Sequence, residues 1–391
     1  MRNETKRRVV MVIFLGILYC GVNPGETTAA DAGLAFQGEL TGWTAFEEND
    51  QAHRELGFRY LPRLKLALPL SDGLSLDSEI MANLYGTLAQ TGAADAETAH
   101  GEKAYRLWAR AYTDQAEVRL GLQEISFGPG KILRSLRWFD QKDSRDPTGF
   151  TDGVNALLFR YYFESNANVW IWSMTGNRDP MGISLLTASD GSLESGGRIQ
   201  IPAGAGELGL SVHQRQVDLA RYSGRPSDPL QENRVGFDLS WDLGVGLYLE
   251  TTWLELARNP LIPEHQLFFT LGGDYTFDVG DGLNSVVELM AVDLKSDSNS
   301  TVDGTIWLLA ISEQLPLNLL DKIQVMAFRN FESRVTTLQT AWQRSTDDWV
   351  ITLMVYTSHF DDGATGSAGD RFSFNSTTGQ KGIRLLIQTN H

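Results

Sequence analysis

Over most of the chain, apolar and polar side chains alternate with a period of two. Between residues 56 and 70, leucine and aromatic residues occupy one set of alternate positions, whereas Arg59 and Arg63 belong to the other set. The stretches 233–242 and 266–277 alternate in the same way. Successive side chains of a β-strand point to opposite faces of the sheet, so this pattern predicts strands with one apolar and one polar face.

The same alternation gives a series of candidate strands. Most of them have about the 9–11 residues that a tilted strand needs to cross a bilayer. We expect about 16–18 of them to form, the number found in larger membrane barrels. The candidates are 34–46, 56–70, 74–85, 103–113, 115–125, 153–164, 166–174, 195–202, 206–217, 233–242, 244–257, 266–277, 283–294, 303–312, 322–331, 335–343, 348–356 and 380–389.

Short breaks rich in Gly and Asp alternate with longer polar breaks, as in barrels with short turns at one rim and long loops at the other. We therefore predict an all-β fold: a closed antiparallel transmembrane β-barrel of about 16–18 strands. A large β-sandwich would also alternate, but aromatic residues at strand ends, such as Trp241 and Tyr275, suit the interfacial girdles of a barrel. The expected long breaks are 90–101, 175–193, 218–231, 295–303 and 358–379.

The start of the chain differs from the rest. Basic residues precede an apolar run at 9–19, and small residues follow up to Ala30. This order is typical of a secretory signal, and the run is short for the alternative, a membrane anchor. We expect residues 1–30 to be a signal peptide, the mature chain to begin near Asp31, and residues 31–391 to form the barrel.

The charge and the cysteine content exclude several classes of partner. The chain has a formal net charge of −16, and without residues 1–30 it keeps 29 basic and 47 acidic residues, a net of −18. Such a chain is unsuited to nucleic acid, whose backbone must be neutralised by Lys and Arg. The only cysteine, Cys20, lies in the predicted signal peptide. We therefore expect no disulfide, no metal site and no cofactor in the mature protein.

If the apolar faces meet lipid, the polar faces line a lumen, and basic residues are prominent on them. The planar fork of arginine matches a carboxylate, so such a wall lowers the barrier for an anion. Arginine–carboxylate pairs that brace the wall are the alternative, since Glu117, Glu164 and Glu250 belong to the same faces. The basic positions are Arg59, Arg63, Lys65, Arg106, Arg110, Arg119, Arg160, Arg198, Arg215 and Arg234.

The most distinctive stretch is 119–153. It begins R-L-G-L-Q-E-I-S-F-G, continues through a basic loop containing Trp, and ends F-T-D-G. This resembles the alginate-export-type family of outer-membrane barrels, whose pattern is R-x-G-x-Q-E-I/L-x-x-G, a basic loop with Trp, and Phe-Asp-Gly. Here Thr151 is inserted in the last element. The resemblance implies a lumen constriction at or near Arg119, Gln123, Arg134, Arg137, Trp138 and Asp152.

Part of this stretch, 126–152, joins two predicted strands and is long and charged. Gly-Pro-Gly at 128–130 breaks the preceding strand, and Lys131 and Arg145 belong to the mixed charges that follow. We expect the segment to fold into the lumen and narrow the pore. An ordinary outer loop with solvated charges is the alternative.

Catalytic motifs are absent from the sequence. The six histidines show no H-x-x-x-H spacing, and there is no G-x-S-x-G, Walker loop or dinucleotide fingerprint, so we expect no enzyme. We expect a monomeric or trimeric porin-like channel in the outer membrane of a Gram-negative-type cell. Its partners would be outer-membrane lipid, a small anionic solute or acidic oligosaccharide, and a periplasmic export partner. The alternative is a scaffold barrel, such as a sheath for a periplasmic or redox partner, without open-pore transport.

Overall fold

Strand pairing organises nearly all of the chain that the structure describes. The computed structural model describes residues 33–48, 52–71, 73–184, 186–220, 228–259, 261–296, 303–361 and 381–391. The predicted signal peptide, Cys20 and the predicted mature start near Asp31 lie outside these ranges. No helix in the described ranges is both long and apolar enough to cross a membrane.

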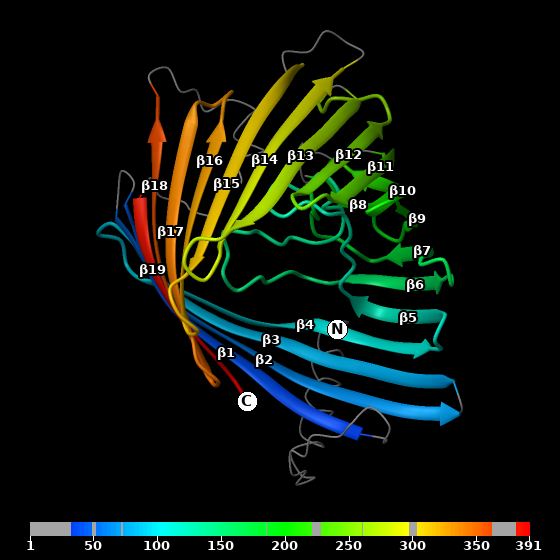
Figure 1. Ribbon diagram of the computed structural model, residues 1–391, viewed down its shortest axis with the longest axis horizontal. Coiled ribbons are helices and arrows are strands. Elements are labelled where there is room, and N and C mark those ends of the chain that lie inside the picture. Colours follow the sequence, from blue (N-terminus) through cyan, green and yellow to red (C-terminus); the bar gives the residue numbers. More distant parts are fainter. Residues whose placement is uncertain are drawn as a thin grey trace.

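Eighteen strands form one closed antiparallel barrel, and a two-residue strand, β8, extends the ladder at the end of β10 (Figure 1). Neighbours in sequence pair with one another, and β1 pairs with β19 to close the sheet. The predicted fold class is confirmed. The strands are β1 (Gly33–Glu48), β2 (Ala52–Ser71), β3 (Leu74–Thr91), β4 (Glu97–Tyr112), β5 (Ala116–Gln123), β6 (Val154–Tyr162), β7 (Asn168–Thr175), β8 (Thr187–Ala188), β9 (Leu193–Ala203), β10 (Gly206–Asp218), β11 (Leu230–Asp242), β12 (Gly246–Leu256), β13 (His265–Phe277), β14 (Leu283–Lys295), β15 (Gly304–Pro316), β16 (Asp321–Asn330), β17 (Val335–Ser345), β18 (Trp349–Phe360) and β19 (Lys381–Asn390).

Side chains alternate between the outer surface and the interior as the sequence predicts. On β2, Leu56 and Phe58 are 59% and 53% exposed, whereas Leu61 is 5% exposed. On β13, Leu271 is 50% exposed and its neighbour Thr270 is fully buried. A surface of exposed apolar side chains is unfavourable in water but matches the lipid-facing band of a membrane barrel.

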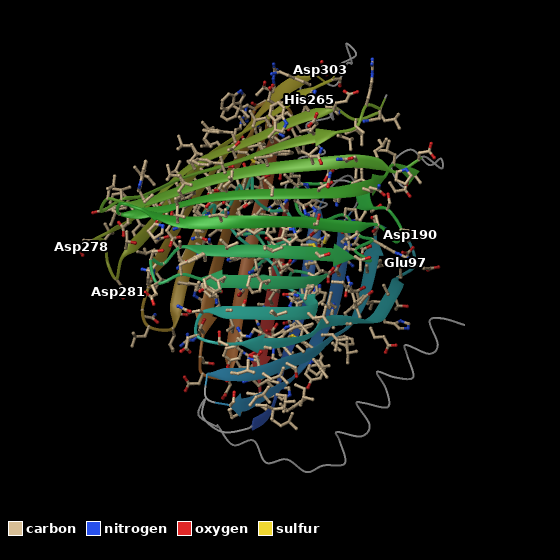
Figure 2. The ribbon with its side chains drawn as sticks, turned by 90° about the vertical axis from the view of Figure 1, so that its right-hand side faces the viewer. Glu97, Asp190, His265, Asp278, Asp281 and Asp303 are labelled. Carbon is tan, nitrogen blue, oxygen red and sulfur yellow. The ribbon has the colours of Figure 1, made fainter. Side chains whose placement is uncertain are left out.

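The two rims of the barrel differ in the length of their connections (Figure 2). Short turns lie at the rim marked by Asp278 and Asp281, and the longer connections lie at the opposite rim, marked by Glu97, Asp190 and Asp303. Ladders of neighbouring strands end together at the short turns, as at Gly206 opposite Ala203. This arrangement agrees with the turn pattern predicted from the sequence.

Two sequence predictions at these connections are wrong. The expected loop at 90–101 shrinks to 92–96, because β3 and β4 continue to pair through small and polar residues that the alternation does not reveal. Glu164, placed on the lumen wall by alternation, lies in the turn after Tyr162, where β6 has already ended.

Strand β4 contains an irregularity that alternation cannot reveal. Its pairing with β3 shifts between Met81 and Ala82, so β4 holds one extra residue there. As a result, two adjacent residues, Tyr105 and Arg106, are both buried, at 8% and 7% exposure. A bulge re-aims side chains in this way, and here it supplies two neighbouring inward groups.

Candidate functional site in the barrel lumen

The longest described connection, residues 124–153 between β5 and β6, lies inside the barrel (Figure 1). We call it the inserted segment. Its Trp138 indole donates a hydrogen bond to the Thr252 hydroxyl on β12 (2.9 Å), and the Ser135 and Thr270 hydroxyl oxygens lie 2.7 Å apart. Thr252 and Thr270 are fully buried inward positions. The segment therefore crosses to the far wall and is not an outer loop.

An apolar core fills the space between the inserted segment and the wall. The Phe127 ring stacks on the Trp172 ring of β7, with centroids 5.9 Å apart. Sequence analysis missed the wall half of this core, although its signal was present as apolar residues at inward positions. The segment supplies Ile125, Phe127, Leu133, Leu136, Trp138 and Phe139, and the wall supplies Leu158, Trp172, Phe268, Met290, Ile306 and Leu308 among others.

Ion pairs and hydrogen bonds make the inserted segment compact. A guanidinium nitrogen of Arg134 lies 2.6 Å from the buried Asp140 carboxylate. The Lys142 ammonium lies 2.6 Å from Glu124, and the Ser144 hydroxyl donates to the backbone carbonyl of residue 131 at 2.7 Å. These contacts tie distant parts of the segment to one another, so it behaves as a folded insert.

The inserted segment also reaches walls away from its main anchor. The Gln339 side-chain amide on β17 donates to the Arg145 carbonyl at 3.2 Å. On the other side, the Phe150 ring lies beneath the Arg59 guanidinium of β2, with 3.8 Å between the guanidinium carbon and the ring centroid. The insert thus contacts walls on several sides of the lumen and narrows it.

Two of the predicted site residues, Arg106 and Trp138, hold the insert in place, and Gln123 joins the two wall strands at its base. Gln123 is fully buried and donates to the Ala156 carbonyl at 2.9 Å. Trp138 is 1% exposed, between the insert and β12. Arg106 donates to the Thr151 carbonyl at 3.1 Å. In this arrangement Gln123 and Trp138 are buried beside the insert and have too little open surface to contact a passing solute.

Three other predicted residues meet around one carboxylate. Arg110 lies 2.6 Å from Asp77 and 3.0 Å from Glu117, and Arg160 lies 3.1 Å from Glu117. Arg119 stands 3.9 Å from Glu117. Three guanidinium groups therefore share two carboxylates. This part of the wall keeps an excess of positive charge.

Arginines of this wall stack on aromatic rings. A guanidinium stacked on a ring keeps its N–H groups, which lie in its own plane, available for an anion. Within the described part of the chain, the guanidinium groups of Arg59 and Arg119 make no hydrogen bond. The stacked pairs, with guanidinium carbon to ring centroid distances, are Arg59–Phe150 at 3.8 Å, Arg119–Trp108 at 4.6 Å and Arg160–Trp170 at 3.7 Å.

The remaining predicted site residues lie apart from one another. Arg137 is on the insert and donates to the Lys142 carbonyl at 3.4 Å. The structure therefore does not gather all the predicted residues into one site. Three further predicted residues, Arg63, Lys131 and Asp152, each form an ion pair at a different place in the barrel. These pairs are Arg63–Glu79 at 3.9 Å, Lys131–Asp274 at 2.8 Å and Lys103–Asp152 at 2.7 Å.

The basic positions on β9–β11 brace the wall. Arg198 lies 2.6 Å from Asp238, and Arg215 and Arg234 each lie 2.6 Å from Glu232. All these side chains are nearly or fully buried. On these three strands the arginines brace the wall, because their guanidinium groups are buried against carboxylates and are not exposed to a solute.

The pKa values of two charged groups of the inserted segment, Glu124 and Arg137, are shifted from their usual values. Burial raises the pKa of Glu124, but the hydrogen bond and charge of Lys142, together with Arg106, outweigh burial and leave the pKa below its usual value. Burial lowers the pKa of Arg137, and Asp140 and Asp143 partly offset this effect.

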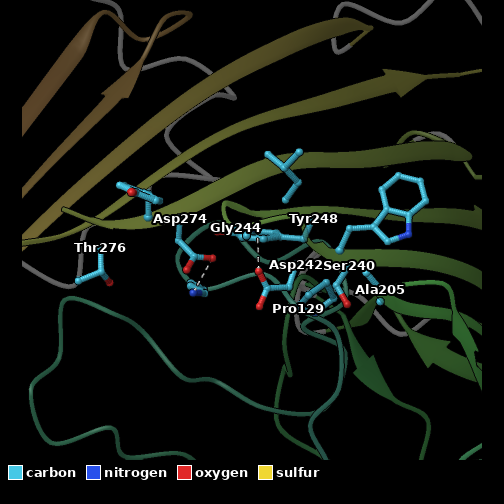
Figure 3. A pocket seen from close by; sticks show the side chains of 14 residues that line it. Pro129, Ala205, Ser240, Asp242, Gly244, Tyr248, Asp274 and Thr276 are labelled. Atoms are coloured by element: carbon cyan, nitrogen blue, oxygen red, sulfur yellow. Dashed lines mark hydrogen bonds and ion pairs between the residues drawn. The ribbon is translucent and has the colours of Figure 1, made fainter. Parts of the chain in front are cut away.

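A cavity of about 520 Å³ lies between the insert and the wall at the short-turn rim (Figure 3). Pro129 and Lys131 of the insert line it together with Asp242, Tyr248 and Asp274 of the wall. One dashed line in Figure 3 marks the ion pair that Asp274 forms with Lys131. Within the described ranges, no group of three His, Cys, Asp or Glu side chains is arranged to hold a metal ion.

Comparison with known proteins identifies the fold. No family model matches the sequence, and no curated protein matches it. OccK7 (OpdD) of Pseudomonas aeruginosa is similar in structure, with a TM-score of 0.56 at 9% identity over 92% of this chain and 99% of that one. OmpF of Salmonella typhi, in complex with daunomycin, has a TM-score of 0.52 at 8% identity over 94% and 100%. The chain has the fold of an outer-membrane porin.

The structure is also similar to an outer-membrane barrel that is not described as a porin. Wzi of Escherichia coli, an outer-membrane protein involved in group 1 capsule assembly and a carbohydrate-binding β-barrel, has a TM-score of 0.52 at 11% identity. That match covers 92% of this chain and 85% of Wzi. Identities this low establish the fold alone, and the resemblance to the alginate-export-type family gains no support from these comparisons.

Proposed function

We propose that this protein is an outer-membrane channel that passes small or linear anionic solutes beside the inserted segment. The observation that carries the proposal is the state of Arg59 and Arg119, whose stacked guanidinium groups make no hydrogen bond to any described residue. Arg63 is only loosely paired, at 3.9 Å from Glu79. In a narrow passage such charges are weakly screened, so they favour anions over cations.

The chemistry of this wall suits acidic saccharides and organic anions. A guanidinium binds a carboxylate through two parallel hydrogen bonds, and an adjacent ring offers an apolar face. Arg119 beside Trp108 and Arg160 beside Trp170 supply both features. The resemblance of 119–153 to the alginate-export-type family supports the same class of solute.

A channel of this kind requires export to the outer membrane, which we infer from the first thirty residues. The mature protein isolated from membranes should begin near Asp31. N-terminal sequencing checks this prediction, and a chain that still begins at Met1 would contradict it.

Planar-bilayer recording under a KCl gradient tests the proposed selectivity. The purified protein should give stepwise currents, and the reversal potential should have the sign expected when chloride passes more readily than potassium. Arg59→Gln combined with Arg63→Gln should move the reversal potential toward zero, because the passage loses two weakly paired cations.

The matched control is Arg384→Gln, which removes an arginine that faces the Glu47 carboxylate at 3.4 Å. It should shift the reversal potential much less. A double variant with the reversal potential of the native protein would show that these arginines do not select the solute.

A scaffold barrel is the second candidate, and one observation favours it. The inserted segment touches β2, β12 and β17 and so obstructs much of the bore. Folded protein that gives no current at any voltage would favour a sheath for a periplasmic or redox partner. Neither candidate requires a catalytic residue or a cofactor.

A further inference from the structure

A single buried carboxylate on β14 accepts hydrogen bonds from three consecutive backbone amides of the inserted segment. Glu288 is fully buried and accepts from the amides of Lys131 (2.7 Å), Ile132 (3.0 Å) and Leu133. The Tyr248 hydroxyl donates to the same carboxylate at 2.6 Å. Four donors to one carboxylate leave little of its hydrogen-bonding capacity unused.

A second buried carboxylate, on β12, holds the flanks of the same stretch. Glu250 is fully buried and accepts from the amides of Gly130 (2.6 Å) and Leu136 (3.1 Å). A Cβ atom at residue 128 or at residue 130 would press against the Glu250 carboxylate, so glycine at both positions permits the close approach. Gly128 also adopts a φ of +93°, which other residues rarely do.

These contacts differ from the other anchors of the insert. Among the described residues, no lysine or arginine forms an ion pair with Glu250 or Glu288. The two carboxylates are satisfied by backbone amides of the insert and by Tyr248. A buried charged group is costly unless it is hydrogen-bonded, so the amides that the insert supplies to these glutamates stabilise the inserted position.

We propose that Glu250 and Glu288 are positioning residues that latch the inserted segment across the lumen, and that releasing this latch widens the passage. The first half of the proposal concerns the position of the insert, whereas the second half rests on the proposed channel function. Both residues act through the insert and need not touch the solute.

Hydrogen exchange of the full-length protein in detergent tests the first half. In a Glu250→Gln, Glu288→Gln variant, the amides of residues 130–136 should exchange at least about tenfold faster, because five hydrogen bonds to carboxylates are weakened. Amides of β2 and β3 should keep their native rates. Native exchange rates at 130–136 would contradict the proposal that Glu250 and Glu288 hold the inserted segment in place.

Glu232→Gln is the matched control. Glu232 is also a buried inward glutamate, but it pairs with Arg215 and Arg234 and not with the insert. This variant should leave exchange at 130–136 unchanged. Equal acceleration in both variants would mean that any loss of a buried carboxylate loosens the barrel, which also overturns the proposal.

Single-channel conductance tests the second half. The double glutamine variant should conduct more than the native protein. Faster amide exchange with native conductance would contradict the proposal that releasing the latch widens the passage.

A Ser135→Cys, Thr270→Cys pair, in a Cys20→Ser background, should form a disulfide where the hydroxyls lie 2.7 Å apart. That disulfide should restore native conductance until it is reduced. If no form conducts, the channel proposal fails, yet the exchange experiment still decides whether the latch exists.

Discussion

Arginine has two roles in this lumen, and the surroundings of each guanidinium decide between them. The Arg198 side chain is 2% exposed and lies 2.6 Å from Asp238, so it is committed to the wall. The Arg119 side chain is 17% exposed and stands 3.9 Å from Glu117. Both residues occupy inward strand positions, so alternation gives them the same prediction. The carboxylate that holds Arg198, Asp238, lies on another strand, β11, and a single sequence does not show which strands bring their charges together.

Glu124 gives the inserted segment a dependence on pH. Its pKa is lowered from the usual value of 4.5, so its contribution to stability is present above that value and is lost as the pH falls below it. At neutral pH, Glu124→Gln should reduce the free energy of unfolding by about 1 kcal/mol, because Lys142 and Arg106 lose a charged partner at a partly exposed site.

The measurement is the denaturant midpoint of both proteins over a pH series. Native protein and variant should converge as the pH falls below 4.5. A difference that is constant across the series would mean that the charge of Glu124 contributes nothing.

At the scale of elements, alternation predicted the barrel strands well but not what their inner faces contact. Each barrel strand overlaps a predicted one, because lipid outside and lumen inside impose a strict period of two. The bulge at Tyr105 and Arg106 breaks that period locally and was missed. The candidate site was predicted less completely. Phe268 and Met290 occupy inward positions because the insert covers them, and that long-range contact has no periodic signature.

Strand β2 offers a test of the face assignment that leaves composition unchanged. Arg63 faces inward and Leu64 faces outward near the middle of the strand. Exchanging them, as Arg63→Leu with Leu64→Arg, should cost about 2–4 kcal/mol, because a charge then lies against lipid near mid-bilayer.

The yield of folded barrel, measured by its heat-dependent mobility on gels, should fall sharply for the exchanged pair. Arg63→Leu alone is the control and should insert normally. Equal yields would refute the assignment of faces on β2.

At the scale of the whole molecule, the barrel has two apolar layers. The outer layer consists of exposed side chains such as Phe58 and Trp253, and the inner layer is the core around Trp172 and Phe127. A barrel of this strand number encloses more space than its own side chains fill. The inserted segment fills much of that space, so the lumen of this protein is shaped by a loop and not by the strands alone.

The barrel does not depend on the insert for closure, and this leads to the last prediction. Gln123 pairs with Val154 at the ends of β5 and β6, so a short Gly-Ser turn can replace residues 126–151 without stretching the sheet. The shortened protein should still insert, since every barrel strand keeps its partners. It should unfold at lower denaturant concentration, because Phe268 and Trp172 lose their apolar cover.

The single-channel conductance of the shortened protein should exceed that of the native protein, whereas replacing loop 92–96 with the same turn should leave conductance unchanged. Native conductance in the shortened protein would show that solutes cross the barrel without meeting the insert, and selectivity would then have to come from the wall arginines alone.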